Sequence, residues 1–160
     1  MSDVVLRRAR GADAPAIADI WFDGWQDGHL GNVPDELVTL RDRDSFYRRA
    51  PERVGDAIVA EIDGVVGGFV MVVGAEVEQV YVAAQYRGGG VAGALLAAAE
   101  ERVRDNGHAV AWLAVSPGNT RARRFYAKFG WTDDGPYLNR VTDRGDTVDV
   151  PTHRYVKPVG

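Results

Sequence analysis

Three consecutive glycines stand between an apolar run and a helical pattern in residues 80–96 (VYVAAQYRGGGVAGALL). Gly88, Gly89 and Gly90 allow the backbone to approach a ligand closely. They also turn several N–H groups toward one point at the start of a helix, where the helix dipole favours anions. Arg87 adds a full positive charge beside them. A diphosphate is the natural ligand of such a loop, so the segment predicts phosphate binding.

Two nucleotide-binding motifs compete with this interpretation. Gly88, Gly90 and Gly93 have the spacing of the dinucleotide motif GxGxxG. That motif expects an acidic residue about 20 positions further on, where the sequence reads AWLAVSPG. The loop also lacks the lysine and the magnesium-binding hydroxyl of a P-loop. Both alternatives are therefore disfavoured.

Two glutamates precede the glycines on a predicted strand, residues 76–82 (EVEQVYV). Side chains alternate along a strand, so Glu76 and Glu78 are expected to share the face that carries Val80 and Val82. An amine with a pKa of about 10.4 must lose a proton before or during nucleophilic attack, and a carboxylate can accept that proton. The alternative is that both glutamates only line a polar cleft and attract a cation.

Strands and helices alternate through the rest of the chain and would hold these segments in place. Asp63-Gly64 is a strong hairpin signal, Asp13 followed by Pro15 can begin a helix, and DGHLGNVPDE reads as a loop. Asn119 is a candidate N-cap. Strands are predicted at residues 4–8, 57–62, 65–73, 76–82 and 109–115, the last wholly buried, and as two closing strands joined by the Arg-Gly-Asp turn at 144–146; helices are predicted at residues 14–22, 35–49, 91–104 and 119–129.

Composition limits the functions that these segments can have. The chain has 160 residues, 46% of them apolar and 26% charged, and we expect residues 1–160 to form a single globular domain. The net charge of −4 disfavours nucleic-acid binding. The sequence shows no secretory signal, no membrane-spanning run and no cysteine, so we expect a soluble cytoplasmic protein without membrane association. The spacing of His29, His108 and His153 predicts no metal site.

Residues 80–93 and 119–131 resemble two motifs of the GNAT superfamily of N-acetyltransferases. In the acyl-CoA-binding motif Gln/Arg-x-x-Gly-x-Gly/Ala, the matching positions are Arg87, Gly90 and Ala92. The second segment, NTRARRFYAKFGW, is similar to Asn-x-x-Ala-x-x-Phe-Tyr-x-x-x-Gly-Phe, with a tryptophan in the last aromatic position. The resemblance follows the order of the predicted elements over nearly the whole chain and weakens only between about Trp25 and Val54.

The resemblance implies an α/β fold, the GNAT fold, with a single mixed, mostly antiparallel β-sheet, helices on both faces and a V-shaped acyl-CoA cleft. It implies acetyl-CoA as the cosubstrate and no metal. The strand at residues 80–82 would bond the pantetheine arm, and the N–H of Val82 would polarise the thioester oxygen, where negative charge develops during attack. The residues expected to bind the coenzyme are Val80, Tyr81, Val82, Arg87, Gly88, Gly89, Gly90, Val91, Ala92, Gly93, Asn119 and Tyr126.

The same resemblance implies the catalytic residues. Glu76 occupies the position of a strand glutamate that acts as the base in many members, directly or through water, and Glu78 is the alternative. Tyr126 corresponds to a tyrosine that donates a proton to the coenzyme sulfur, a step that suits a phenol with a pKa of about 10. We therefore expect Glu76, Glu78 and Tyr126 to be the catalytic residues.

The acceptor is expected to be a primary amine of a small molecule that receives the acetyl group directly in a ternary complex. Trp25, His29 and Tyr47 could line its pocket, because the family builds that wall from the first two helices and their loop. Two other functions stay open: a non-catalytic acyl-CoA sensor, and an enzyme that acetylates protein N-termini or lysines. The protein is expected to be a monomer or a homodimer.

Overall fold

Seven strands of the described chain form one sheet, in the order β1-β2-β3-β4-β5-β7-β6. The computed structural model describes residues 3–29, 31, 33–143 and 145–160. Neighbouring strands run antiparallel, except for β4 and β5, which run parallel. The strands are β1 (Val4–Arg8), β2 (Ala57–Ile62), β3 (Val65–Val73), β4 (Glu76–Val82), β5 (Val110–Val115), β6 (Thr132–Asp143) and β7 (Asp146–Pro158). The α-helices are α1 (Ala14–His29), α2 (Asp35–Leu40), α3 (Arg43–Arg53), α4 (Val91–Asp105) and α5 (Thr120–Lys128).

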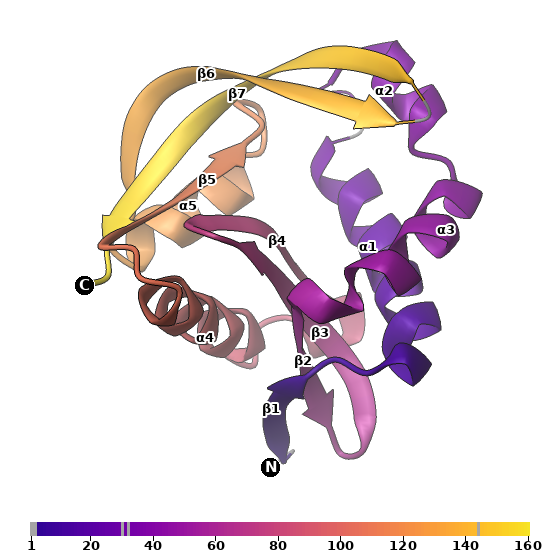
Figure 1. Cartoon of the computed structure of the whole chain (residues 1–160), viewed down its shortest axis with the longest axis vertical. Coiled ribbons are helices and arrows are strands. Elements are labelled where there is room, and N and C mark those ends of the chain that lie inside the picture. Colours follow the sequence, from indigo (N-terminus) through magenta and orange to yellow (C-terminus); the bar gives the residue numbers. More distant parts are fainter. Residues whose placement is uncertain (1–2, 30, 32, 144) are drawn as a thin grey trace.

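Helices cover both faces of this sheet, with α4 on one side and α1 and α3 on the other (Figure 1). The apolar residues of α4 recur every third or fourth position, and among them Leu95 and Val103 are fully buried against the strands. On the opposite face, the ring centroid of Trp21 lies 5.3 Å from that of Phe46 and 6.0 Å from that of Phe69. These two clusters form the core, and the predicted fold class is confirmed.

A bulge in β4 changes which of its side chains share a face. Met71 pairs with Gln79 and Val72 pairs with Val77, so Glu78 has no partner on β3. Such an extra residue interrupts the ladder and shifts the alternation of the side chains that follow it. The strand is therefore regular before and after Glu78 but not across it.

The bulge overturns part of the predicted alternation. Val77 packs beneath α4 together with Val80 and Val82, whereas Tyr81 packs on the face of α1. The two glutamates of β4 share a face, as expected, but it is the face of α1 and not the face of the valines. Gln79, opposite a residue of the α1 cluster, also lies on that side.

The strands β4 and β5 separate from one another along their length. Within the described chain a single residue pair joins them. In the ladder between β3 and β4, the amide of Ala83 donates to the carbonyl of Gly67 at 2.8 Å. Because bonded and non-bonded pairs alternate in an antiparallel ladder, the N–H and C=O groups of Val80 and Val82 point away from β3. These main-chain groups therefore face the gap toward β5.

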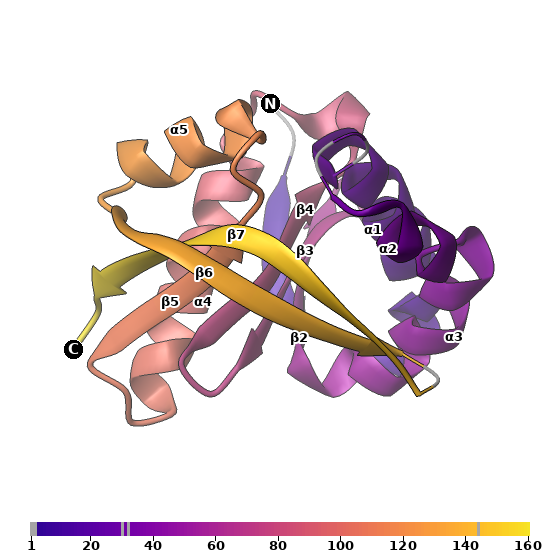
Figure 2. The same cartoon turned by 90° about the horizontal axis from the view of Figure 1, so that it is seen from above.

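The closing hairpin crosses over this gap. One half of β7 pairs with β5, and the other half extends with β6 toward α2 (Figures 1 and 2). Val148 and Val150 in the extended half are buried in the same cluster as α1 and α3. The prediction of two closing strands is confirmed, while Arg144 of the predicted turn lies outside the described residues.

The first helix is longer than predicted, because α1 continues through part of the predicted loop to His29. Gly24 and Gly28 lie within the helix and each permits a close contact. A Cβ at Gly24 would lie 2.3 Å from the ring of Tyr81, and one at Gly28 would lie 2.8 Å from Nδ2 of Asn119. These glycines bring α1 against the central strand and against the start of α5, and they do not end the helix.

Two further predictions were wrong. The helix expected over residues 35–49 is two helices, because Arg41 leaves the helical conformation and Asp42 begins a new one. The side chain of Asp42 accepts a hydrogen bond from the amide of Ser45 at 2.9 Å, which caps α3. The strand β5 is also not wholly buried, since only every second residue is shielded from solvent.

Candidate active site

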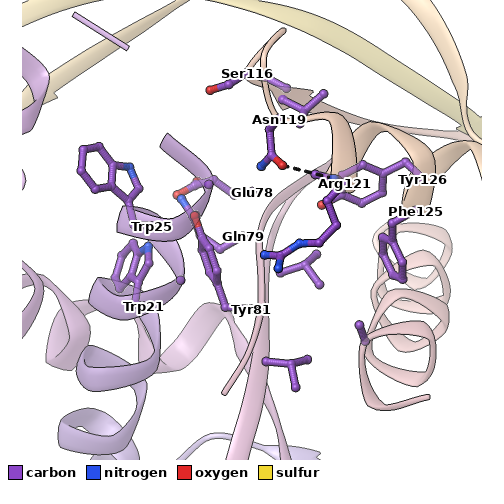
Figure 3. Close-up of a pocket in the computed structure, with 18 of the residues that line it drawn as sticks. Trp21, Trp25, Glu78, Gln79, Tyr81, Ser116, Asn119, Arg121, Phe125 and Tyr126 are labelled. Carbon is purple, nitrogen blue, oxygen red and sulfur yellow. Dashed lines mark hydrogen bonds between the residues drawn. The ribbon is translucent and has the colours of Figure 1, made fainter. Parts of the chain in front are cut away.

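The gap between β4 and β5 contains a cavity of about 490 Å³, a volume that suits a small-molecule site. Its walls come from α1 to α3, from β4 with the start of α4, from the end of β5 with α5, and from the β6–β7 hairpin. Figure 3 shows side chains of α1 and of α5 facing one another across it. The elements on both sides of the diverging strands thus contribute to one site.

The predicted phosphate loop forms one end of the cavity. Gly88 and Gly90 have φ angles of 85° and 81°, which glycine adopts without the steric cost of a Cβ. No described atom lies within 4 Å of the place where a Cβ would stand at either residue. Arg87 donates to the carbonyl of Val82 at 3.3 Å and forms an ion pair with Asp27 at 3.0 Å. Backbone conformation, and not packing, therefore requires glycine here, and the space in front of the amides is open.

The neighbouring residues divide between the cavity and the core. Ala92 and Gly93 line the cavity, whereas the side chain of Val91 is buried beneath the sheet. A Cβ at Gly93 would lie 2.9 Å from the ring of Phe129, so this glycine also permits α4 to pack against α5. Gly89 is exposed in the loop and does not contribute to the cavity wall.

The central strand and the start of α5 supply polar main-chain and side-chain groups. Val80 and Val82 line the cavity with their outward N–H and C=O groups, while the ring of Tyr81 turns toward α1 (Figure 3). Oδ1 of Asn119 accepts a hydrogen bond from the amide of Ala122 at 3.2 Å (Figure 3). The predicted N-cap is therefore confirmed, and Asn119 also lines the cavity.

Tyr126 lies on the α5 wall of the cavity (Figure 3). Its ring packs edge-on against Trp131, with the centroids 6.1 Å apart, and lies 6.2 Å from the ring of Tyr155. Burial raises the pKa of the Tyr126 phenol above its ordinary value, so the hydroxyl keeps its proton at neutral pH. A protonated phenol on a cavity wall can donate to a leaving group.

Glu78, the bulged residue of β4, lies on the same wall as α1 and α3 and lines the cavity. Its Oε1 accepts a hydrogen bond from Nη1 of Arg53 at 2.7 Å, and Nε of Arg53 also donates to Asp56 at 3.2 Å. The arginine therefore fixes the position of the Glu78 carboxylate beside the cavity.

Glu76 lies close to this pair but does not contribute to the cavity wall. Burial, followed by the charge of Glu78, raises the pKa of Glu76 to about 7, against the opposing charges of Arg53 and Arg154. A carboxyl group with a pKa near neutrality is suited to accept and release protons. The two glutamates thus differ: Glu78 contacts the cavity directly, and Glu76 lies behind it.

The predicted acceptor residues lie in different places. Trp25 lines the cavity and packs against Phe46, with the ring centroids 6.1 Å apart. Tyr47 lies outside the cavity, because its neighbour Phe46 takes the inward position and the Tyr47 hydroxyl donates to Asp19 between the exposed surfaces of α1 and α3. His29 ends α1, and its side chain lies outside the described part of the chain.

Several residues of the cavity wall carry no motif and were missed by the sequence analysis. Ser116 is 2% exposed, and its Oγ has no hydrogen-bond partner among the described residues. A buried hydroxyl normally has a partner, so a ligand atom could complete this one. The four-residue spacing of Trp21 and Trp25 predicts that they share one face of a helix. No sequence pattern predicts that residues of the β6–β7 hairpin line the cavity. The missed residues include Trp21, Arg41, Arg49, Gln79, Ser116, Arg121, Asn139, Val141, Val150 and Thr152.

The described residues contain neither a metal-binding cluster nor a membrane-spanning helix. Among the described residues, histidine, aspartate and glutamate side chains do not gather in groups of three or more that could bind a metal ion. In the same part of the chain, every helix is too short or too polar to span a membrane.

Comparisons with known proteins show the family to which the chain belongs. The sequence model of the acetyltransferase (GNAT) family matches residues 15–131 of this chain. An uncharacterized N-acetyltransferase of Mycobacterium tuberculosis is 30% identical over 118 residues, which are 68% of this chain and 76% of that protein. The crystal structure of a GCN5-related N-acetyltransferase from Rhodopseudomonas palustris has a TM-score of 0.74 at 23% identity and covers 99% of this chain and 97% of its own.

A second solved structure shares the fold and contains a cosubstrate. It is a putative acetyltransferase from Salmonella typhimurium with its cofactor acetyl-CoA, with a TM-score of 0.71 at 22% identity over 99% of this chain and 95% of that chain. The family match covers well over half of the sequence. The chain therefore belongs to the acetyltransferase (GNAT) family and is an acetyl-CoA-dependent acyltransferase.

Proposed function

We propose that this protein transfers the acetyl group of acetyl-CoA directly to a primary amine of a small molecule while both substrates are bound. One arrangement carries the proposal: the outward main-chain groups of Val80 and Val82 lie along a cavity that has Glu78 on one wall and Tyr126 on another. This combination supplies an anion for an ammonium group, a donor for a carbonyl oxygen and a proton for a leaving thiolate.

The residues of the cavity fit the coenzyme. The amides of residues 88–90 and the charge of Arg87 would hold the diphosphate, and Val80 and Val82 would bond the amide groups of the pantetheine arm as an added strand does. The unpartnered hydroxyl of Ser116 and the amide of Asn119 lie on the same wall as Tyr126 and offer further donors. Acetyl-CoA supplies a thioester, whose carbonyl carbon is open to attack by an amine.

The proton transfers follow from the positions of three side chains. Glu78 would bind the acceptor ammonium, and Glu76 behind it would receive the proton through a water molecule. The amine nitrogen then forms a bond to the acetyl carbon, the N–H of Val82 stabilises the charge on the oxygen, and the carbon–sulfur bond breaks. Tyr126 donates its proton to the departing thiolate. The products are an N-acetylated amine and free coenzyme A.

The hairpin supports a small acceptor in preference to a protein. Val141, Val150, Asn139 and Thr152 from β6 and β7 line the cavity on the side of α1 to α3. The extended half of the hairpin packs on those helices and crosses in front of the central strands toward α3 (Figure 2). A folded polypeptide would have to displace it, whereas a small molecule fits beneath.

The proposal is tested by incubating the protein with acetyl-CoA and a panel of primary amines, with thiol release and the mass of the acetylated product as readouts. Transfer to a small amine and initial rates that depend on both substrates in a ternary-complex pattern are expected. A matched Glu78→Gln variant should raise the KM for the amine but leave coenzyme A affinity unchanged. Coenzyme binding without transfer to any amine would instead identify an acyl-CoA sensor.

A further inference from the structure

Arg154 is a residue of β7 that does not contribute to the cavity wall. It pairs with Ala114 of β5, and its neighbour Tyr155 is buried beneath α4. Because side chains alternate along a strand, the side chain of Arg154 lies on the opposite face of the sheet, the face of α1 and α3. There its guanidinium carbon lies 4.8 Å from the ring centroid of Trp112 on β5, a contact that holds a cation over an indole ring.

Trp112 brings this guanidinium close to Glu76. Within the described chain, Glu76 and Trp112 form the single residue pair between β4 and β5, and paired strands lie about 4.8 Å apart. The side chains of Glu76 and Arg154 also lie on the same face of the sheet. The charge of Arg154 accordingly acts on the Glu76 carboxyl group. Burial and Glu78 raise the pKa of that group, while Arg53 and Arg154 oppose the rise.

The other charges of this cluster are paired, but two buried donors are not. Arg53, at the end of α3, bonds Glu78 at 2.7 Å and Asp56 at 3.2 Å. Nε of Arg154 and Nη2 of Arg53 are buried and have no hydrogen-bond partner among the described residues. Buried donors of this kind are rare in native proteins, because each costs free energy. A carboxylate accepts hydrogen bonds at both oxygens, so the ionised form of Glu76 suits these donors.

We propose that Arg154 is a positioning residue of the acetyl transfer, whose Nε–H binds the ionised carboxylate of Glu76 and holds it ready to accept the proton of the acceptor amine. The inference rests on the proposed function, in which Glu76 receives that proton through water, and adds a residue to it. When the proton arrives, the carboxylate becomes a neutral carboxyl group and releases Nε of Arg154. When the proton leaves to solvent, the two groups pair again as a hydrogen bond between charged groups.

The first test follows the two groups by NMR and needs no turnover. Isotope-labelled protein is titrated between about pH 5 and 9 while the Nε–H signal of Arg154 and the carboxyl signal of Glu76 are recorded, each assigned by its absence from a variant. Both signals should shift with one midpoint near pH 7, and the Arg154 signal should cease to titrate in Glu76→Gln. An Nε–H signal that is independent of pH in the wild type would overturn the inference. This test does not depend on whether a variant of Arg154 folds.

The second test is the pH profile of kcat/KM in Arg154→Gln. Loss of a nearby opposite charge should raise the midpoint of Glu76 by about one pH unit. The variant should therefore lose about fivefold in kcat/KM at pH 7 and less than about twofold at pH 9, where Glu76 is ionised in both proteins. Arg154→Lys keeps the charge and should restore most of the loss. Arg140→Gln is the matched control and should not change the profile, since Arg140 is a 72% exposed arginine of the same hairpin that pairs with Asp149 outside the cavity wall.

The outcomes separate this inference from the proposed function. An equal loss at pH 7 and pH 9 in Arg154→Gln would show that Arg154 only supports the packing around Trp112; it would overturn the inference and leave the acetyl transfer standing. If the wild type transfers acetyl to no amine, the NMR titration still decides. A shared midpoint would then support the pairing of Arg154 with Glu76 and refute the transfer, whereas separate midpoints would overturn the pairing as well.

Discussion

Replacing Glu76 by glutamine removes one ionisable group and keeps its shape. The pKa of Glu76 is about 7, mainly because the carboxyl group is buried and then because Glu78 lies near it. Its ordinary value is 4.5, so between these two pH values the folded protein binds more protons than the unfolded chain. The stability that protonation provides is fully present below about pH 4.5 and is lost as the pH rises through about 7. At about 1.4 kcal/mol for each pH unit the full shift corresponds to about 3 kcal/mol, and solvent screening of this partly exposed carboxyl reduces the loss to about 1–2 kcal/mol.

The Glu76→Gln variant is therefore expected to be more stable than the wild type at a pH above about 7, where the wild-type carboxyl group is ionised. Glu76→Gln should be more stable than the wild type by about 1–2 kcal/mol at pH 8, and the two proteins should be equally stable near pH 4. Urea unfolding followed by tryptophan fluorescence at several pH values measures the difference. Glu78→Gln is the control, because it leaves the guanidinium of Arg53 without its 2.7 Å partner and should lower stability at pH 8.

The same substitution tests the role of Glu76 in proton transfer. In the wild type, kcat/KM should rise with a midpoint near pH 7 as Glu76 loses its proton, on top of the ionisation of the acceptor amine, which both proteins share. Glu76→Gln should lose that rise and about 100-fold in kcat/KM at pH 8. An unchanged pH profile would refute Glu76 as the proton acceptor. A variant less stable than the wild type at pH 8 would refute the argument from burial.

Three other substitutions separate the functions of the cavity walls. Tyr126→Phe should lower kcat by about 10- to 100-fold with coenzyme A affinity within about threefold by calorimetry, and an unchanged kcat would exclude it as the proton donor. Gly90→Ala should cost about 1 kcal/mol through its positive φ and should weaken coenzyme A binding by about tenfold; full affinity would contradict a phosphate site at its amide. Gly24→Ala should cost about 2 kcal/mol in urea unfolding, because its Cβ would lie 2.3 Å from the ring of Tyr81, whereas Gly11→Ala, which meets no described atom within 4 Å, should be nearly neutral.

Most of the fold could be predicted from the sequence, because local sequence signals and tertiary structure agree over much of the chain. The strands β2, β3 and β4 begin and end at the predicted residues, since β-branched runs and the Asp63-Gly64 turn set their limits. The helices that were predicted wrongly lie where local signals had more than one meaning. Gly28 belongs to a segment rich in turn residues, yet it lies inside α1 and allows the approach of Asn119. Only the structure shows which residue a glycine has to accommodate.

The site was predictable to the extent that motifs carry it. The left-handed glycines of the proposed phosphate loop and the N-cap of α5 could be predicted from residues 87–93 and from Asn119, because each requires particular residue types at fixed spacing. The wall that we propose for the acceptor could not be predicted in this way. Arg49 looks like any exposed cation of a polar helix until its stacking on Trp21 and Phe46 is seen, and Ser116 follows a strand without any distinguishing neighbour.

The chemistry of the cavity depends on one extra residue in β4. With regular alternation, Glu78 would share a face with Val80 and Val82, and its carboxylate would point into the apolar cluster beneath α4. The bulge at Glu78 instead places this carboxylate with Tyr81 on the face of α1, within reach of Arg53. At the same time, the outward main-chain groups of the two valines remain directed toward β5. A single insertion in the strand ladder therefore brings the proposed ammonium site and the proposed thioester site together in one cleft.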